Sequence, residues 1–241
     1  MMDKTTGSEA RERIINAAIE LFSRKGYDAT TVNDIAGAAN VNKALIYYYF
    51  KNKQDILDFM VDSILDDAVS GMLDYIQTNI VQMVRDGHLD IKPDRLHFAN
   101  DEAINAFLQN SYKFYVRVID YVIAKKEIIR ILVLESLKKG KHQNSLFRFM
   151  KFMSGNDENP FFKTISSADQ DFVYSEEMVL FKFFFSIIPI VSFAAYFDDY
   201  KAVSSLSDAE LRRSFMRVYH IINKSLISGS DILLRSHGPD A

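Results

Sequence analysis

Residues 30–53 bring together the side chains of this chain that are best suited to hydrogen-bonding another molecule. The segment reads TTVNDIAGAANVNKALIYYYFKNK and contains three consecutive tyrosines, and from Lys43 onward it carries lysines but no acid. Asn and Lys side chains can bind the edges of adenine and guanine, whereas hydroxyl and ammonium groups bind phosphates. The chemistry that this segment indicates is therefore contact with a nucleic acid.

Two short helix patterns joined by a tight turn would position these side chains. Thr31 and Asp34 are spaced as a capping box with a shorter acid, which predicts the start of the first helix. Asn40 is the best candidate for a left-handed backbone in the turn, and Asn42 is expected to cap the second helix. This arrangement predicts a helix-turn-helix, whose second helix enters the major groove of DNA.

The flanking segments supply the apolar support that such a motif needs. An earlier helix is expected to begin at Ser8 as N-cap and to end at Gly26, with Ile14, Ala18 and Phe22 on its inner face. A following helix is predicted to begin at Asn52, with Asp55 at its third position. Ile46 and Phe50 lie one turn apart in the second helix of the motif, so they are expected to point into the core between these helices.

Residues 8–65 carry a sequence of motifs in a fixed order. They are Gly26-Tyr27, Thr30-Thr31, Ile35-Ala36, Asn40-Val41-Asn42, Ile46-Tyr47, Tyr48-Tyr49-Phe50 and Lys53. In type, order and spacing this region resembles the DNA-binding domain of TetR-family transcriptional regulators. Asn40 and Asn42 replace the family's usual Gly and Ser, and Ala44 and Leu45 stand where Gly and Thr are common. The last two departures leave the operator sequence open.

The resemblance implies roles for individual residues. The positions that face base edges are Asn33, Asn42, Lys43, Ala44, Leu45 and Tyr48, and the positions that contact phosphates are Thr31, Tyr47, Tyr49 and Lys53. Packing in the core is the alternative for the tyrosines. The implied protein is a homodimeric repressor that binds a near-palindromic operator in double-stranded DNA and is released by an unknown small-molecule effector.

Composition and periodicity describe the rest of the chain. Nine glycines and four prolines among 241 residues, with long segments of helical period, predict an all-α fold: a DNA-binding domain over 1–53 and a larger domain over 54–241. The expected helices beyond the first domain cover 53–86, 101–124, 126–139, 142–154, 169–200 and 207–234, with breaks at 87–100, 140, 155–167 and 204–207. Residues 1–53 carry 8 basic and 6 acidic side chains and the remainder 21 and 26, so a mildly basic head precedes an acidic body.

The last two predicted helices are candidates for subunit pairing, which the resemblance places in a four-helix bundle. The residues expected at that interface or in the core beside it are Phe181, Phe185, Ile188, Phe193, Phe215, Tyr219, Ile222 and Leu226. The apolar stretch Met178 to Phe197 also admits a membrane span, but Lys182, Pro189 and the acidic flank disfavour it, so no membrane partner is expected. The absence of cysteines and of a signal peptide indicates a cytoplasmic protein.

An effector pocket is expected among the aromatic residues of the larger domain. The candidates for its lining are Phe107, Tyr112, Tyr115, Glu135, Phe147, Met150 and Phe184, with plain core packing as the alternative for each. The chain has no phosphate loop, metal-ligand spacing or nucleophile motif, so neither cofactor, metal nor enzyme activity is expected. The competing hypothesis is a small-molecule-binding protein or enzyme whose N-terminal head serves docking rather than DNA binding.

Overall fold

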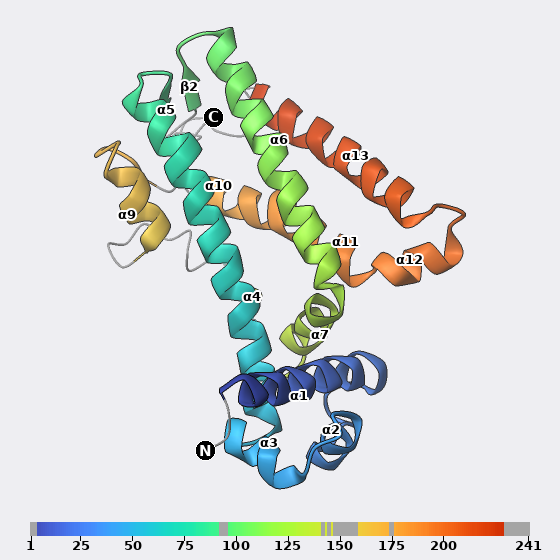
Figure 1. Ribbon diagram of the computed structural model, residues 1–241. Coiled ribbons are helices and arrows are strands. Elements are labelled where there is room, and N and C mark those ends of the chain that lie inside the picture. Colours follow the sequence, from blue (N-terminus) through green and yellow to red (C-terminus); the bar gives the residue numbers. More distant parts are fainter. Residues whose placement is uncertain are drawn as a thin grey trace. The chain divides into compact units, whose positions relative to one another are not determined.

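The computed structural model describes residues 4–91, 96–140, 143, 146, 159–173 and 176–228. These residues are helical apart from connecting turns and one two-stranded hairpin (Figure 1), so the all-α prediction is confirmed. The chain divides into two compact units: Met1–Ala68 with Lys125–Ser145, and Val69–Ala124 with Leu146–Ala241. The division differs from the predicted boundary after Lys53, because the start of the fourth helix and a helix from the middle of the chain belong to the first unit.

Unit 1 contains α1 (Lys4–Lys25), α2 (Val32–Ala38), α3 (Lys43–Tyr49), the first part of α4 (Lys53–Tyr75) and α7 (Lys126–Leu137). α1 packs against α2, α3 and α7. The side chains that fill the centre of this unit are fully buried: Ile14, Phe22, Ile35, Ile46, Ile56, Leu57 and Met60. α1 begins at least four residues before Ser8, so Ser8 lies inside the helix and the prediction of Ser8 as its N-cap was wrong.

Unit 2 begins with the later part of α4, which continues into a π-helical turn, η1 (Ile76–Val81), and α5 (Gln82–Arg85). The strands β1 (Leu89–Ile91) and β2 (Leu96–Phe98) follow as an antiparallel pair with Leu89 opposite Phe98, where only a break was expected. The next helix, α6 (Asp101–Ala124), has the predicted bounds. Apolar residues of η1, α5, the hairpin and α6 form one core cluster, which includes Ile76, Met83 and Phe107.

The short helix α9 (Pro160–Ser166) lies where the sequence was expected to break. Asn159 caps it by accepting the Phe161 N–H at 2.9 Å, and Pro160 occupies the first turn, where the absence of an N–H costs nothing. Asn159-Pro160 therefore begins a helix at a place where the sequence was expected to break. The helix expected over 142–154 falls almost wholly outside the described residues.

The predicted long helix over 169–200 is divided into α10 (Glu176–Phe181), the π-helical η3 (Lys182–Ile187), α11 (Ile188–Ala195) and α12 (Phe197–Val203). Pro189 cannot donate to the helical ladder, which accounts for an interruption near the start of α11. α13 (Asp208–Ser228) follows and packs on α6, where Arg212 pairs with Asp120. α11 also packs on α6, so α6 is the central helix of this part of unit 2.

Candidate nucleic-acid interface

The start of α2 is fixed by reciprocal hydrogen bonds between Thr31 and Asp34. The Thr31 N–H donates to the Asp34 carboxylate at 2.8 Å, and the Asp34 N–H donates to Thr31 Oγ1 at 3.1 Å. The Thr31 N–H and the Thr31 hydroxyl, which also donates to the carboxylate at 2.8 Å, favour its ionised form and lower the pKa of Asp34 below its usual value. The predicted capping box is confirmed, and it holds Asn33 on the exposed side of α2.

The turn between α2 and α3 depends on Asn40. Its φ of 52° is left-handed, and it is the one non-glycine residue with positive φ among the described residues. The Val41 N–H donates to the Ala36 carbonyl at 3.0 Å, which closes the turn behind it. Asn tolerates this backbone conformation better than other side chains do, as the sequence predicted.

α3 presents one face to the core and the other to solvent. Ile46 is fully buried and Phe50, directly after the helix, is 3% exposed, whereas Tyr47 and Tyr48 are 48% and 77% exposed. Lys43 and Ala44 are exposed as well, and Leu45 is half-buried. Lys43, Ala44, Tyr47 and Tyr48 therefore form the solvent-facing side of α3.

Ring contacts link the polar side chains on this face of α3. Lys43 Nζ lies 5.8 Å from the centre of the Tyr47 ring, and Tyr48 meets the half-buried Tyr49 edge to face at 4.9 Å. The outward hydroxyls and the ammonium can therefore reach a neighbouring molecule without breaking the core.

Asn42 is already engaged within the motif. Its Oδ1 accepts the Leu45 N–H at 2.8 Å, which caps α3 as predicted. A bidentate contact with adenine would use this same oxygen. Capping and base reading therefore compete at this residue, whereas the exposed Asn33 has no such role at the helix start.

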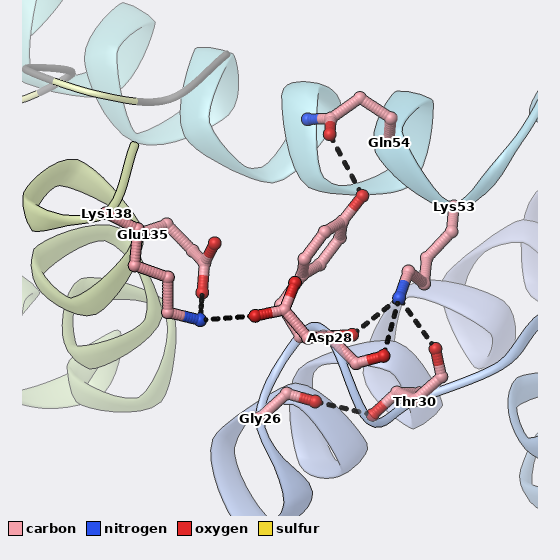
Figure 2. Close-up of polar contacts among 8 residues, drawn as sticks. Gly26, Asp28, Thr30, Lys53, Gln54, Glu135 and Lys138 are labelled. Carbon is pink, nitrogen blue, oxygen red and sulfur yellow. Dashed lines mark hydrogen bonds and ion pairs between the residues drawn. The ribbon is translucent and has the colours of Figure 1, made fainter. Parts of the chain in front are cut away.

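Lys53 is likewise engaged within unit 1. Its ammonium donates to the carbonyl oxygens of Tyr27 and Thr30 at 2.6 and 2.8 Å, and it lies 4.2 Å from the centre of the Tyr27 ring (Figure 2). The Tyr27 hydroxyl donates to Gln54 Oε1 at 2.9 Å. Burial is the largest of several causes that raise the pKa of Tyr27 to about 12, so this hydroxyl remains protonated. Lys53 and Gln54 thus fasten the start of α4 to the turn between α1 and α2.

The sequence profile of the "Bacterial regulatory proteins, tetR family" matches residues 14–59, which include α2, α3 and the turn between them. Residues 14–59 of this chain are therefore similar to the tetR family. The match includes the exposed tyrosines of α3, but it neither includes α7 nor extends into unit 2.

Two curated relatives are similar to part of this chain. One is the "Biofilm operon icaADBC HTH-type negative transcriptional regulator IcaR" of Staphylococcus aureus (strain Newman), 42% identical over 73 residues, which are 30% of this chain and 34% of that protein. The protein of the same name from Staphylococcus epidermidis is 40% identical over 63 residues, 26% of this chain and 34% of its own. This chain therefore spans about a third of the length of these relatives.

A solved structure, "Clostridium perfringens putative fatty acid metabolism regulator", superposes with a TM-score of 0.48 at 16% sequence identity. The superposition covers 92% of this chain and 100% of that one.

The residues predicted to line a pocket belong to both units. Glu135 belongs to unit 1, where its buried carboxylate accepts from Lys138, while Phe107 lies in the apolar core of unit 2. The other candidates in unit 2 differ in exposure or fall outside the described residues: Tyr112 is 41% exposed, Phe184 is 52% exposed, Tyr115 is half-buried, and Phe147 and Met150 are not described.

The residues predicted for subunit pairing divide into an exposed and a packed set. Phe185 and Ile222 are 51% and 45% exposed. Phe193 and Phe215 stack on each other at 3.9 Å, and Tyr219 is buried in the protomer, where its hydroxyl donates to the Ser186 carbonyl at 3.0 Å. Tyr219 therefore belongs to the core beside the exposed face. Phe181 and Ile188 are half-buried, and the side chain of Leu226 lies outside the described residues.

Among the described residues, no single helix is both long and apolar enough to cross a membrane, although the bent pair Val179–Ala195 and Phe197–Val203 has the length and composition to do so. No three His, Asp or Glu side chains in the described part of the chain lie close enough to share a metal ion.

The sequence did not reveal that Lys138 contacts Asp28. Lys138 follows α7, and its ammonium lies 2.9 Å from Asp28 Oδ2 in the turn after α1 (Figure 2). The two residues are 110 positions apart, and neither periodicity nor capping patterns relate residues at such a separation.

Proposed function

We propose that this protein is a sequence-specific DNA-binding transcriptional regulator, a homodimeric repressor that a small-molecule effector releases from its operator. The observation that carries the proposal is the outward face of α3. Tyr47, Tyr48 and Lys43 project from a rigid helix whose other face is anchored by Ile46 and Phe50. A helix held in this way at the second position of a helix-turn-helix can enter the major groove as a unit.

Within this proposal the exposed side chains take separate roles. Asn33, Lys43, Ala44, Leu45 and Tyr48 meet base edges, and Leu45 and Ala44 contribute apolar contact with thymine methyl groups. Tyr47 and Tyr49 position the helix on the phosphates, whereas the N–H and Oγ1 of Thr31 are engaged by Asp34 in the capping box. We assign Asn42 to capping and Lys53 to holding the turn, because their polar atoms already serve those purposes.

Repression and dimerisation have different support. The two curated relatives are named as negative regulators, which favours repression over activation. Exposed apolar side chains on the helices after Glu176, including Phe185 and Ile222, favour association with a second copy. A dimer presents two reading helices about 34–36 Å apart, one turn of DNA, and so requires a near-palindromic site.

The test is selection of bound DNA fragments from the source genome by the full chain. We expect a two-fold-symmetric sequence to be enriched, and the variant Tyr48→Ala with Lys43→Ala to lose the enrichment. Lys139→Ala serves as the control, because this exposed lysine lies outside α2 and α3. Failure to enrich any preferred sequence at low salt would refute the proposal.

A further inference from the structure

Two lysines from distant parts of the chain contact the turn between α1 and α2, residues 26–31. Lys53 at the start of α4 donates to the carbonyl oxygens of Tyr27 and Thr30, and Lys138 after α7 donates to the carboxylate of Asp28 (Figure 2). The turn ends at Thr31, the N-cap of α2. The turn that leads into α2 is therefore contacted by two cations, one from α4 and one from the segment after α7.

Lys138 is itself fixed by a second acid. Its ammonium lies 2.6 Å from Glu135 Oε1, and the Glu135 side chain is only 10% exposed, whereas that of Asp28 is 76% exposed. Both acids, with the hydrogen bond to Glu135 as the largest cause, raise the pKa of Lys138 above its usual value. Glu135 thus keeps the ammonium charged and aimed at the turn, while the outer contact with Asp28 remains open to solvent.

We propose that Lys138 is a positioning residue for DNA binding: by holding Asp28 it fixes the start of α2, and with it the orientation of α2 and α3, from α7. The inference rests on the proposed function, because it assigns a role within the same DNA-binding surface. α7 thereby helps to orient the reading head, by which we mean the helix-turn-helix formed by α2 and α3, although the TetR-family match ends at residue 59. Glu135 acts here on Lys138 and not as a residue of an effector pocket.

The size of the effect follows from solvent exposure. Ion pairs between exposed side chains change an equilibrium by about 1.5- to 5-fold, and salt weakens them. We therefore expect losses of this size in operator affinity for each reading head. The buried Glu135 behaves differently, because removing Lys138 alone leaves its charge without its cation and destabilises unit 1.

The variants are chosen to separate positioning from folding and from net charge. Asp28→Asn removes the outer end of the contact. The double variant Glu135→Gln with Lys138→Met removes the inner pair without leaving a buried charge, and Lys138→Arg restores a cation. Glu20→Gln is the matched control, since Glu20 pairs with Arg24 at 2.9 Å in unit 1 but does not contact the turn.

The measurements are affinity for the selected operator, affinity for random DNA, and hydrogen exchange of the turn amides, including Thr30, whose N–H donates to the Tyr27 carbonyl. Positioning predicts weaker operator binding and faster exchange in both Asp28→Asn and the double variant, with neither change in Lys138→Arg or Glu20→Gln. Simple electrostatics predicts the opposite sign for Asp28→Asn, because loss of an acid strengthens binding to DNA.

Unchanged exchange in the turn, or operator binding by Asp28→Asn that equals or exceeds that of the wild type, would overturn the role of Lys138. Wild-type protein that selects no operator would instead refute the proposed function, and the exchange measurement would still decide whether Lys138 holds the turn.

Discussion

Asn33 and Asn42 are two amide side chains of the helix-turn-helix, and they differ in what their atoms already do. Asn42 Oδ1 accepts the Leu45 N–H, while Asn33 is exposed on α2. Lys43 and Lys53 differ in the same way. The Lys43 ammonium lies near the exposed Tyr47 ring, whereas the Lys53 ammonium donates to backbone carbonyls. At this scale, the roles of similar side chains follow from the partners that they have in the free protein.

Replacement of Asn42 distinguishes capping from base reading. Ser caps a helix about as well as Asn does, whereas Ala does not, so Asn42→Ala should lower the free energy of unfolding by about 1 kcal/mol and Asn42→Ser by only a few tenths. Urea unfolding measures this difference. We expect Asn42→Ser to select the same operator as the wild type, and an altered base preference in this variant would show that Asn42 reads DNA after all.

Replacement of Lys53 tests its assignment to the turn. Lys53→Met leaves the Tyr27 and Thr30 carbonyls without their charged donor, so unfolding should become easier by about 1–3 kcal/mol. A lysine that neutralises one phosphate contributes close to one unit to the slope of log affinity against log salt. We expect the slope of operator binding to change by clearly less, and a loss of a full unit would return Lys53 to the phosphate contacts.

The elements of the reading head are delimited by short-range hydrogen bonds. Thr31 with Asp34 begins α2, Asn40 turns the chain, and Asn42 begins α3. Each of these caps, and the turn residue, lies within four residues of the helix end that it defines. The start of each helix therefore depends on local bonds, while the buried Ile35 and Ile46 anchor α2 and α3 in the core of unit 1.

The capping box at Thr31 should make α2 sensitive to acid. The folded state lowers the pKa of Asp34, chiefly through the Thr31 N–H, so the bond stabilises the fold at pH values above the ordinary carboxyl pKa of about 3.9. This stabilisation should disappear as the pH falls through the lowered native pKa. Asp34→Asn should remove that part of the acid dependence, as measured by thermal unfolding between pH 6 and pH 2 (about the range over which carboxylates titrate). The Asp55→Asn variant provides a comparison at the start of α4, and an identical acid dependence in Asp34→Asn and wild type would contradict this view.

The left-handed residue of the turn offers a second test. Asn40→Gly should be nearly neutral, because Gly adopts a φ of 52° without steric cost. Asn40→Ala should lose about 1–2 kcal/mol, the cost of placing an ordinary L-residue in this conformation. Chemical denaturation of both variants gives the comparison, and equal stability of the two would show that the turn relaxes to another backbone conformation.

At the scale of the whole molecule, each of the two units has its own core. Unit 1 gathers α1, α2, α3 and α7 around Phe22 and Ile46, and the cluster in unit 2 surrounds Ile76 and Phe107. Exposed apolar side chains are concentrated in unit 2 on α10 to α13, where Phe185 and Ile222 are about half exposed. Such surface is costly in a monomer and favours association.

Introduction of like charges on this surface tests dimerisation. Phe185→Glu combined with Ile222→Glu should convert the dimer to a monomer, because a charged group cannot be buried at a subunit contact without a partner. Light scattering after size exclusion measures the mass, and operator binding should weaken in parallel. Leu137→Lys is the control, since Leu137 is 81% exposed but belongs to α7 in unit 1. A dimer that survives the double substitution would place the subunit contact elsewhere.

The reading head could be predicted from the sequence because its defining relations are local. The capping box, the left-handed Asn40, the cap at Asn42 and the burial of Ile46 all follow from spacings of three or four residues, which backbone geometry fixes directly. The same reasoning misplaced the start of α1 and missed α9, since several residue types at a helix end are compatible with either a start or a break.

The tertiary structure alone decided which polar and aromatic side chains are already in use. The pairing of Lys138 with Asp28, the carbonyls around Lys53 and the burial of Tyr219 join residues 23 to 110 positions apart. No sequence period encodes such contacts, because they arise when separate helices pack and each side chain takes the partner that packing brings within reach. The sequence by itself determined the type and spacing of the groups in the reading head, and the packing of the helices decided which of them remain available to another molecule.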